Sequence, residues 1–376
     1  MYYCVHCLNT STRPNIIFDS DGLCYPCSNH QNDEDIDWDE RNKKLSEIID
    51  FGRRNNQSGY ECIVGVSGGK DSTRQALHIK EHFNLKPLLV SMNYPPQQMS
   101  QRGADNLSNL IKKGFDCVNI GCAPLTWKKT MRHAFVNYGN WAKATEFALF
   151  ASVPRLAIAY QIPLIWWGES AATLLGDMGV LGAHPSDGNR LKYSNTLGGG
   201  GVEWLTNAGF KREHILQYIY PSDEEMSRAN LRIIFMDYFM KDFTNYANGN
   251  YSALRGLVIR KANPHIDPDI FGNSMLDEDF MNVNMYIRYL KFGFGRTSDI
   301  VNLEIRAGRM TREEGIKLVS RYDGNYDRSL IEKFADYIGI TVEGFWSVVD
   351  RFANKELFEK ISDGNYYPKF KVGVGV

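Results

Sequence analysis

Short apolar runs alternate with segments of helical periodicity along the first part of the chain. The apolar runs lie at 60–66, 87–92, 117–120 and 162–167, and the first of them is rich in β-branched residues. Runs of this length read as buried strands. Because strands that alternate with helices form parallel βαβ units, we predict a doubly wound α/β domain whose sheet is covered by helices on both faces.

Helical spacing predicts further elements outside this alternation. Residues 41–54 carry apolar positions on one face, after an acidic run over 32–40 that we interpret as a solvated linker docked through Trp38. Beyond Tyr251 the strand signal fades, and 328–338 and 342–352 have helical spacing. Thr311 and Glu314 form the pattern of a capping box, which we read as structural.

The composition is that of an ordinary globular chain. It has 376 residues, of which 43% are hydrophobic and 23% charged, and its formal net charge is -1. The chain as a whole therefore lacks the excess of positive charge that is typical of nucleic-acid-binding proteins. No secretory signal and no run of about eighteen apolar residues occurs, and seven cysteines are too few for a secreted disulfide scaffold. We therefore expect a cytoplasmic protein without a membrane span.

Four cysteines stand in two pairs near the start of the chain. Cys4 and Cys7 form one C-x2-C pair and Cys24 and Cys27 the other, with sixteen residues between the pairs. This spacing is typical of a structural zinc site with four thiolate ligands. An iron–sulfur cluster or a redox pair are the alternatives, although redox pairs occur singly at a helix start. We predict that the four cysteines bind Zn²⁺ and that the metal supplies folding energy to residues 1–31.

The first predicted strand runs directly into a glycine-rich turn. The turn comprises Ser67, Gly68, Gly69, Lys70, Asp71 and Ser72. The two glycines lack Cβ atoms, so backbone N–H groups can approach a polyphosphate, and the helix expected from Asp71 adds the positive end of its dipole. Lys70 supplies a positive charge, and the serines offer hydroxyls. The turn is not a Walker A loop, which requires an earlier glycine; a turn without a ligand is the alternative.

The motif SGGKDS resembles the signature of the PP-loop ATP-pyrophosphatases, which adenylate an oxygen atom and hold pyrophosphate in the loop. The cysteine pairs, the loop, and the segments 162–169, 291–299 and 308–315 together resemble the N-acetyl sugar amidotransferases of bacterial surface-polysaccharide biosynthesis. This resemblance spans nearly the whole chain. The patterns along the chain divide it into four parts: a zinc-binding knuckle at 1–31, an acidic linker and helix at 32–58, a PP-loop domain at 59–250, and a mainly helical region at 251–376.

The resemblance implies a reaction with ATP, Mg²⁺ and a nucleotide-linked N-acetylated sugar, typically a UDP-diacetamido uronic acid. ATP adenylates the acetamido carbonyl oxygen, ammonia attacks, and AMP leaves to give an acetamidino group. Amide oxygen is a poor leaving group, so its activation makes chemical sense. The pathway implied is lipopolysaccharide O-antigen biosynthesis.

The source of ammonia is expected to be a separate glutaminase subunit. Position two is Tyr2, and none of the three unpaired cysteines, Cys62, Cys117 and Cys122, stands in a nucleophile elbow. The family resemblance adds a subunit similar to the cyclase of the histidine pathway. The sequence leaves open a homodimer.

The predicted catalytic residues are Lys70, Asp71, Glu169 and Arg296. The predicted ATP-binding residues are those of the loop, Ser67 to Ser72, together with Met92 at the end of the second strand. Asp71 is expected to help hold Mg²⁺. Glu169 follows the fourth strand and could orient nucleotide, metal or substrate, or make a structural hydrogen bond.

Lys291 and Arg296 flank Gly293 and Gly295, an arrangement that could place donors on the phosphates or the carboxylate of the substrate. We predict both as substrate-binding residues, with a plain turn as the alternative. Two rival functions stay open. A tRNA thiolase combines a PP-loop with cysteine pairs but needs a basic surface, and a nucleotide-binding subunit could lack turnover.

Overall fold

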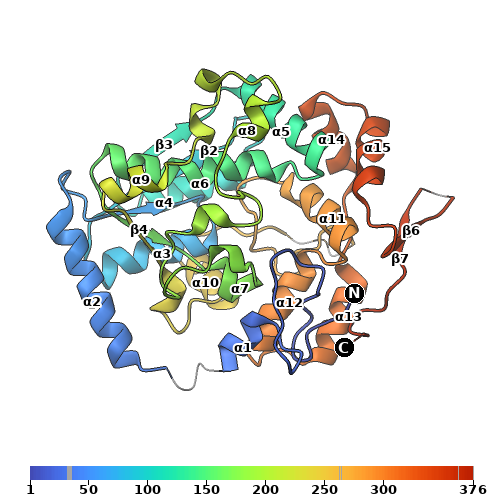
Figure 1. The fold of residues 1–376 in the computed structure, drawn as a ribbon, viewed down its shortest axis with the longest axis horizontal. Coiled ribbons are helices and arrows are strands. Elements are labelled where there is room, and N and C mark those ends of the chain that lie inside the picture. The colour runs from blue at the N-terminus through green and yellow to red at the C-terminus, as the bar shows by residue number, and fades with distance from the viewer. Residues whose placement is uncertain (32–35, 262, 264, 363, 376) are drawn as a thin grey trace.

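The computed structural model describes residues 1–31, 36–261, 263, 265–362 and 364–375. Its centre is a parallel sheet of five strands in the order β3-β2-β1-β4-β5 (Figure 1). The strands are β1 (Cys62–Gly65), β2 (Pro87–Asn93), β3 (Cys117–Gly121), β4 (Leu164–Trp167) and β5 (Arg232–Phe235). The strand order reverses between β1 and β4, where a doubly wound sheet binds its ligands. The predicted α/β fold class is confirmed.

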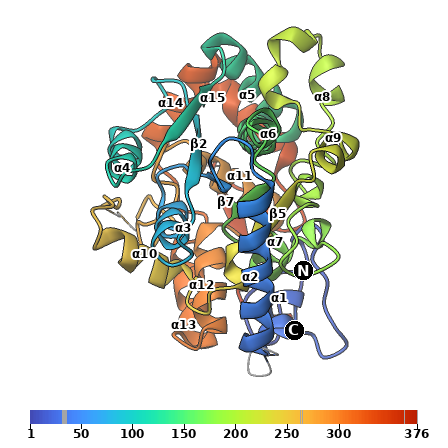
Figure 2. The ribbon, with the colours of Figure 1, turned by 90° about the vertical axis from the view of Figure 1, so that its left-hand side faces the viewer.

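Helices cover both faces of this sheet (Figure 2). One face packs against α2 (Trp38–Asn55), α3 (Lys70–Glu81) and α4 (Gln101–Ile111) through a core that includes Val64, Leu89 and Trp166. The other face packs chiefly against α6 (Ala142–Ala159), which follows α5 (Pro124–Tyr138), through a core with Ile63, Leu88 and Ile165. Successive strand residues point to opposite faces, so the apolar runs of β1, β2 and β4 are buried on both sides. The run at 117–120 was also predicted to be buried, but it forms the edge strand β3 and is only partly buried.

The chain between β4 and α10 departs from the simple alternation of strands and helices. Apart from β5, its regular elements are all short. The α-helices are α7 (Ala171–Leu175), α8 (Glu203–Thr206) and α9 (Asp223–Arg228), and the 3₁₀ turns are η2 (Met178–Val180), η3 (Leu191–Tyr193), η4 (Arg212–His214), η5 (Leu216–Tyr218) and η6 (Met236–Tyr238). The strand β5 was not predicted. It has four residues and its first, Arg232, is exposed, so periodicity gives too little signal to identify it.

The C-terminal region is mainly helical, and its first helix, α10, begins before the predicted boundary at residue 251. It comprises α10 (Asn245–Ala253), α11 (Met281–Phe292), α12 (Arg296–Arg306), α13 (Arg312–Tyr322), α14 (Arg328–Ile338) and α15 (Val342–Phe352), followed by the antiparallel hairpin of β6 (Phe358–Lys360) and β7 (Tyr366–Pro368). The bounds of α14 and α15 agree with the sequence prediction. The capping box of Thr311 and Glu314 is present at the start of α13, whereas the hairpin was not predicted.

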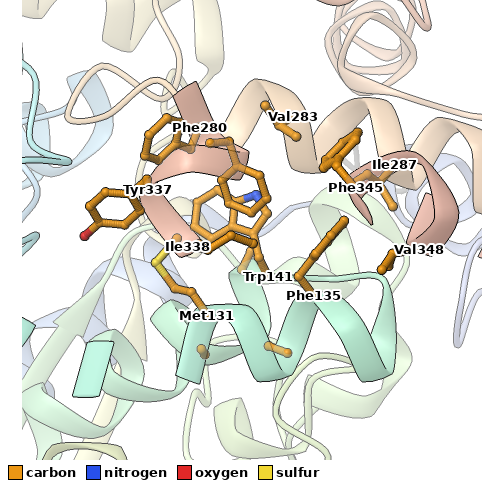
Figure 3. Packing of buried hydrophobic residues seen from close by; sticks show 14 of the residues in the cluster. Met131, Phe135, Trp141, Phe280, Val283, Ile287, Tyr337, Ile338, Phe345 and Val348 are labelled. Carbon is orange, nitrogen blue, oxygen red and sulfur yellow. The ribbon is translucent and has the colours of Figure 1, made fainter. Parts of the chain in front are cut away.

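The C-terminal helices share a hydrophobic core with α5 and α6 (Figure 3). The residues labelled there come from α5, α11, α14, α15 and the ends of neighbouring segments: Met131, Phe135, Trp141, Phe280, Val283, Ile287, Tyr337, Ile338, Phe345 and Val348. Phe135 stacks on Phe345 with ring centroids 5.1 Å apart. This packing holds the C-terminal helices firmly against the α/β body.

The N-terminal segment with the paired cysteines packs on α12 and α13. Leu8 shares a buried core with Val301, Ile305 and Val319. The segment ends in α1 (Tyr25–Gln31), and the two chain ends lie close together (Figures 1 and 2), with the Tyr3 backbone nitrogen donating to the carbonyl oxygen of Gly375 at 3.3 Å.

The predicted acidic linker is shorter than expected. Residues 32–35 lie outside the described residues, and α2 begins at Trp38 because the Asp37 side chain accepts from the backbone nitrogens of Asp39 and Glu40. Within the described ranges, no helix combines the length and the apolar character needed to cross a membrane.

Candidate nucleotide-binding and metal sites

The glycine-rich loop lies between the end of β1 and the start of α3. Its Gly68 has φ +79°, and a Cβ atom there would lie 2.7 Å from the backbone nitrogen of Leu107, so only glycine fits. Gly69 is the N-cap of α3 and provides no side-chain cap. The first N–H groups of α3 are therefore available to an anionic ligand.

A cavity of about 190 Å³ opens beside this loop. It brings together six of the predicted site residues: Ser67, Gly69, Asp71, Ser72, Met92 and Glu169. Its remaining wall is partly apolar, with Val90, Leu149 and Val153. The cavity therefore has a polar end at the loop and an apolar end between the sheet and α6. These two ends suit a ligand in which a phosphate group is joined to a flat ring.

The side chains of Lys70 and Asp71 are held in defined positions. Lys70 Nζ lies 2.6 Å from Asp71 Oδ2, and the Asn248 amide nitrogen donates to Asp71 Oδ1 at 2.8 Å. The Ser252 hydroxyl donates to the backbone oxygen of Lys70 at 2.8 Å. Asn248 and Ser252 both belong to α10, so a helix of the C-terminal region fixes the geometry of the loop.

Three carboxyl groups lie near one another at this end of the sheet. Burial raises the pKa of Glu169 well above its usual range, the neighbouring Asp71 raises it further, and Lys70 opposes the shift. Burial also raises the pKa of Asp237 to about 6, although Asp237 Oδ2 accepts from the backbone nitrogen of Ser170 at 3.1 Å. A cation that bridged Asp71 and Glu169 would relieve the repulsion between them.

Four predicted site residues do not line this cavity. Gly68 and Lys70 belong to the loop beside it, whereas Lys291 and Arg296 lie elsewhere. Lys291 is in the last turn of α11, where its Nζ donates to the backbone oxygen of Tyr138 at 2.8 Å. Arg296 begins α12 and donates to the hydroxyl of Ser274. Neither lines the loop cavity. Gly293 adopts φ +80° and caps α11, as the plain-turn alternative anticipated.

Sequence reasoning missed Asn248, Ser252 and Asp237. Asn245, Asn248 and Ser252 recur at helical spacing and are all buried. A polar stripe of this kind on a short helix is a signal that could have identified Asn248 and Ser252, because buried amides need partners. Asp237 lies in η6 and has no such signal.

The four paired cysteines form a compact cluster. Their sulfur atoms all lie within 4.8 Å of one another, and the four residues are buried. Cys7 Sγ and Cys24 Sγ are 3.7 Å apart, which agrees with the separation of about 3.8 Å in a tetrahedron of thiolates around Zn²⁺ at roughly 2.3 Å. The donor set and spacing fit a single tetrahedral ion, so Cys4, Cys7, Cys24 and Cys27 could hold zinc.

Hydrogen bonds to sulfur support the same geometry. The backbone nitrogens of Asn9 and Cys24 lie 3.3 Å from the sulfurs of Cys7 and Cys4 respectively. N–H groups directed at thiolates stabilise their negative charge and orient them around a metal. His6 Nδ1 is 3.6 Å from the sulfur of Cys27, so His6 contacts a ligand residue without belonging to the cluster.

Comparison with known proteins relates the C-terminal region to a biosynthetic family. Residues 240–371 match the family model described as "LPS biosynthesis protein WbpG-like, C-terminal domain". This similarity includes α10 and all the helices that follow it.

Two further similarities are weaker. A stretch of 110 residues is 28% identical to the "Uncharacterized protein MJ1599" of Methanocaldococcus jannaschii, covering 29% of this chain and 38% of that protein. A solved structure, an NH3-dependent NAD synthetase from Campylobacter jejuni in complex with the nitrate ion, is 13% identical and covers 61% of this chain and 100% of that chain. Its TM-score of 0.30 is too low to support an argument.

Proposed function

We propose that this protein is an ATP-dependent amidotransferase of lipopolysaccharide biosynthesis. Its substrate is a nucleotide-linked N-acetylated sugar, such as a UDP-diacetamido uronic acid, and its product carries an acetamidino group. The observation that carries the proposal is the contact between two parts of the chain: α10, within the LPS-biosynthesis similarity, donates to Asp71 of the SGGKDS loop.

ATP fits the loop cavity by the chemistry of its walls. Gly69 and the uncapped start of α3 offer backbone N–H groups to the phosphates. The apolar wall of Val90, Leu149 and Val153 suits the adenine ring. Asp71 and Glu169 together would hold Mg²⁺, which supplies charge neutralisation to the phosphates.

The proposed reaction has two steps, adenylation of the acetamido oxygen and its displacement by ammonia. The acetamido carbonyl oxygen attacks the α-phosphorus of ATP, a new O–P bond forms, and the bond to the β-phosphate breaks to release pyrophosphate. Ammonia then attacks the activated carbon, the C–O bond breaks, and AMP leaves with the former carbonyl oxygen. Lys70 and the N–H groups of the loop would stabilise the charge that develops on pyrophosphate.

Ammonia would come from a separate glutaminase subunit. The three cysteines outside the cluster are poorly suited to be glutaminase nucleophiles: Cys62 is fully buried in β1, and burial raises the pKa of Cys117 to about 11 and of Cys122 to about 12. Thiols with such pKa values carry almost no thiolate near neutral pH. A purified chain active with ammonium and inert with glutamine would support a partner, whereas glutamine use by the isolated chain would contradict it.

An isotope experiment tests the reaction itself. The protein is incubated with ATP, ammonium and a UDP-diacetamido uronic acid whose acetamido oxygens are ¹⁸O, and AMP is analysed by mass spectrometry. We expect one ¹⁸O atom in AMP, because the carbonyl oxygen leaves with it. A Lys70→Met variant serves as the control for contaminating activity.

The other outcomes separate the rival functions. AMP that forms without label would show that another oxygen is activated, as in a tRNA thiolase. No AMP with any acceptor would indicate a nucleotide-binding subunit without turnover. Either result would overturn the proposal.

A further inference from the structure

A second cleft has a volume of about 360 Å³. It lies between α1 of the N-terminal segment and the chain that follows β5. Its walls come from α1, the start of α2, α7, the chain after β5, and the C-terminal end of α12. This volume falls within the usual range for small-molecule sites. The cleft is distinct from the loop cavity, and none of the predicted site residues lines it.

The cleft carries an excess of positive charge. Arg41, Lys241 and Arg306 line it, and of its described lining residues only Asp237 is acidic. None of the three cations forms an ion pair with a carboxylate within the described part of the chain. Unpaired cations that converge on a concave surface favour an anionic ligand.

Arg306 is the most informative of these residues, because it is buried and only partly satisfied. Its exposure is 8%, and its Nη2 donates to the backbone oxygen of Leu174 at 2.6 Å. Its Nη1 is buried and has no hydrogen-bond partner in the described residues. A buried charged donor without an acceptor is costly, so a purely structural role for Arg306 leaves this nitrogen unexplained.

Arg41 is held in place by its surroundings. Its guanidinium donates to the backbone oxygen of Tyr238 at 2.6 Å and lies over the Tyr238 ring at 3.9 Å. The ring of Trp38 is 5.2 Å from the same group. Lys241 is exposed at the rim of the cleft. The cleft thus combines two positioned guanidinium groups with an adaptable ammonium group.

The cleft lies next to the loop cavity, and Asp237 and Glu169 lie where the two meet. Asp237 lines the cleft and lies within electrostatic reach of Glu169, which lines the cavity. The backbone nitrogen of Asp237 donates to the carbonyl oxygen of Gly168 at 3.1 Å. A ligand in the cleft would therefore lie beside the group that we propose to take part in catalysis.

Two of the three cations come from the region with the LPS-biosynthesis similarity. Lys241 and Arg306 fall within residues 240–371, whereas the loop lies outside them. From these observations we propose that the cleft binds the anionic groups, phosphate or carboxylate, of the acceptor sugar nucleotide. This inference rests on the proposed function, because it assigns an acceptor to the neighbouring ATP site.

Calorimetric titration of the full chain tests the cleft without turnover. The loop is first saturated with a non-hydrolysable ATP analogue, so that added phosphates cannot bind there. Three probes follow: UDP-glucuronic acid, UDP-N-acetylglucosamine and uridine. We expect both UDP compounds to bind, with affinity that falls as salt rises, and uridine to bind at least about ten-fold more weakly. Tighter binding of UDP-glucuronic acid would assign part of the charge recognition to the carboxylate.

Charge variants identify the residues responsible. Arg306→Gln should weaken UDP-sugar binding about ten-fold or more, and Lys241→Ala, at an exposed position, about three-fold. Lys317→Ala, on the exposed side of α13 and outside the cleft, is the matched control and should leave affinity unchanged.

Three results would overturn the inference: no binding of either UDP compound, uridine binding as tightly as they do, or unchanged affinity in Lys241→Ala and in a folded Arg306→Gln. These results are independent of the proposed reaction, whose failure would appear as absent ¹⁸O transfer while UDP-sugar binding persists.

Discussion

Asn248 donates a hydrogen bond of 2.8 Å to the carboxylate of Asp71, although the two residues are 177 positions apart. Lys70 holds the other oxygen of the same carboxylate at 2.6 Å. Asp71 is therefore oriented from both sides, once by its own loop and once by α10. Because Asn248 is fully buried, the C-terminal region and the loop form one continuous structure.

Replacing Asn248 should impair turnover. In Asn248→Ala, Asp71 loses a hydrogen bond to its charged form, an interaction that contributes about 1.5–3 kcal/mol. We expect the rate of pyrophosphate release to fall about ten- to a hundred-fold, as measured with ATP, ammonium and the acceptor sugar. Asn248→Asp, which places a second negative charge beside Asp71, should be at least as severe.

The exposed Asn250 on the same helix provides the matched control. Asn250→Ala should retain the rate, and thermal unfolding of all three variants shows whether the fold is intact. If folded Asn248→Ala released pyrophosphate at the original rate, the orienting role of Asn248 would be disproved.

The parts of the fold that could be predicted are those set by neighbouring residues. The strand β1, the glycine turn and the α3 helix follow one another directly, and Gly68 has the positive φ that its residue type allows. The bounds of α14 and α15 were predicted from the helical spacing of their apolar residues, and the side chains of Asp327 and Thr341 cap the starts of the two helices. The cysteine cluster follows from spacing alone.

The parts that could not be predicted depend on contacts between distant segments. No local pattern shows that Asn248 reaches Asp71, or that Arg306 joins Arg41 in one cleft. Lys291 shows the same dependence on distant contacts. Its position before Gly293 predicts a substrate contact, and the structure adds that its amine donates to the backbone oxygen of Tyr138, 153 positions away, and does not line the loop cavity.

Loss of the metal should unfold the N-terminal segment and loosen α12. In Cys24→Ser, one thiolate is removed from the cluster, and we expect zinc content to fall from about one ion per chain to near zero. The Leu8 backbone nitrogen donates to Asn302 of α12 at 2.7 Å, so hydrogen exchange of α12 should accelerate as well. Elemental analysis and hydrogen-exchange mass spectrometry measure the two effects.

The control is Cys117→Ser, which changes a thiol on β3 outside the cluster. It should keep the zinc and the exchange pattern. Full zinc occupancy in Cys24→Ser would show that the cluster does not bind the metal in the way that we propose.

Arg13 and Asp299 form a second link between the N-terminal segment and α12. Their side chains are 2.6 Å apart and both are buried. Although burial alone would raise the pKa of Asp299, the guanidinium groups of Arg288 and Arg13 outweigh it and hold this pKa well below its usual range. Arg13→Met should therefore destabilise the protein, but by less than the about 3–5 kcal/mol typical of an uncompensated buried charge, because Arg288 Nη2 stays 2.6 Å from Asp299 Oδ2.

A double-mutant cycle with Asp299→Asn distinguishes this pairing from a simple packing loss. The two changes together should cost less than the sum of the single changes, as measured by urea unfolding. Strict additivity would show that Arg13 and Asp299 do not stabilise each other.

Asp237 should make stability depend on pH in a narrow window. Burial raises its pKa to about 6, whereas an aspartate in an unfolded chain ionises near pH 3.9, at about two units lower. Between about pH 4 and 6 the unfolded state has lost this proton and the folded state retains it, so the contribution of Asp237 to stability falls as pH rises. The total change is up to about 3 kcal/mol.

Asp237→Asn removes this titration, because asparagine resembles the protonated acid in shape and charge. Relative to the original protein, the variant should gain stability from about pH 4 to pH 6 and show a constant difference above that range. Urea unfolding at steps of one pH unit measures the difference. The stability difference between the variant and the original protein could instead stay constant from about pH 4 to pH 6, or change in the opposite direction. Either result would mean that Asp237 is ionised in the folded protein throughout this range. The surroundings of Asp237 and Glu169 would then be more solvated than the burial of Asp237 implies.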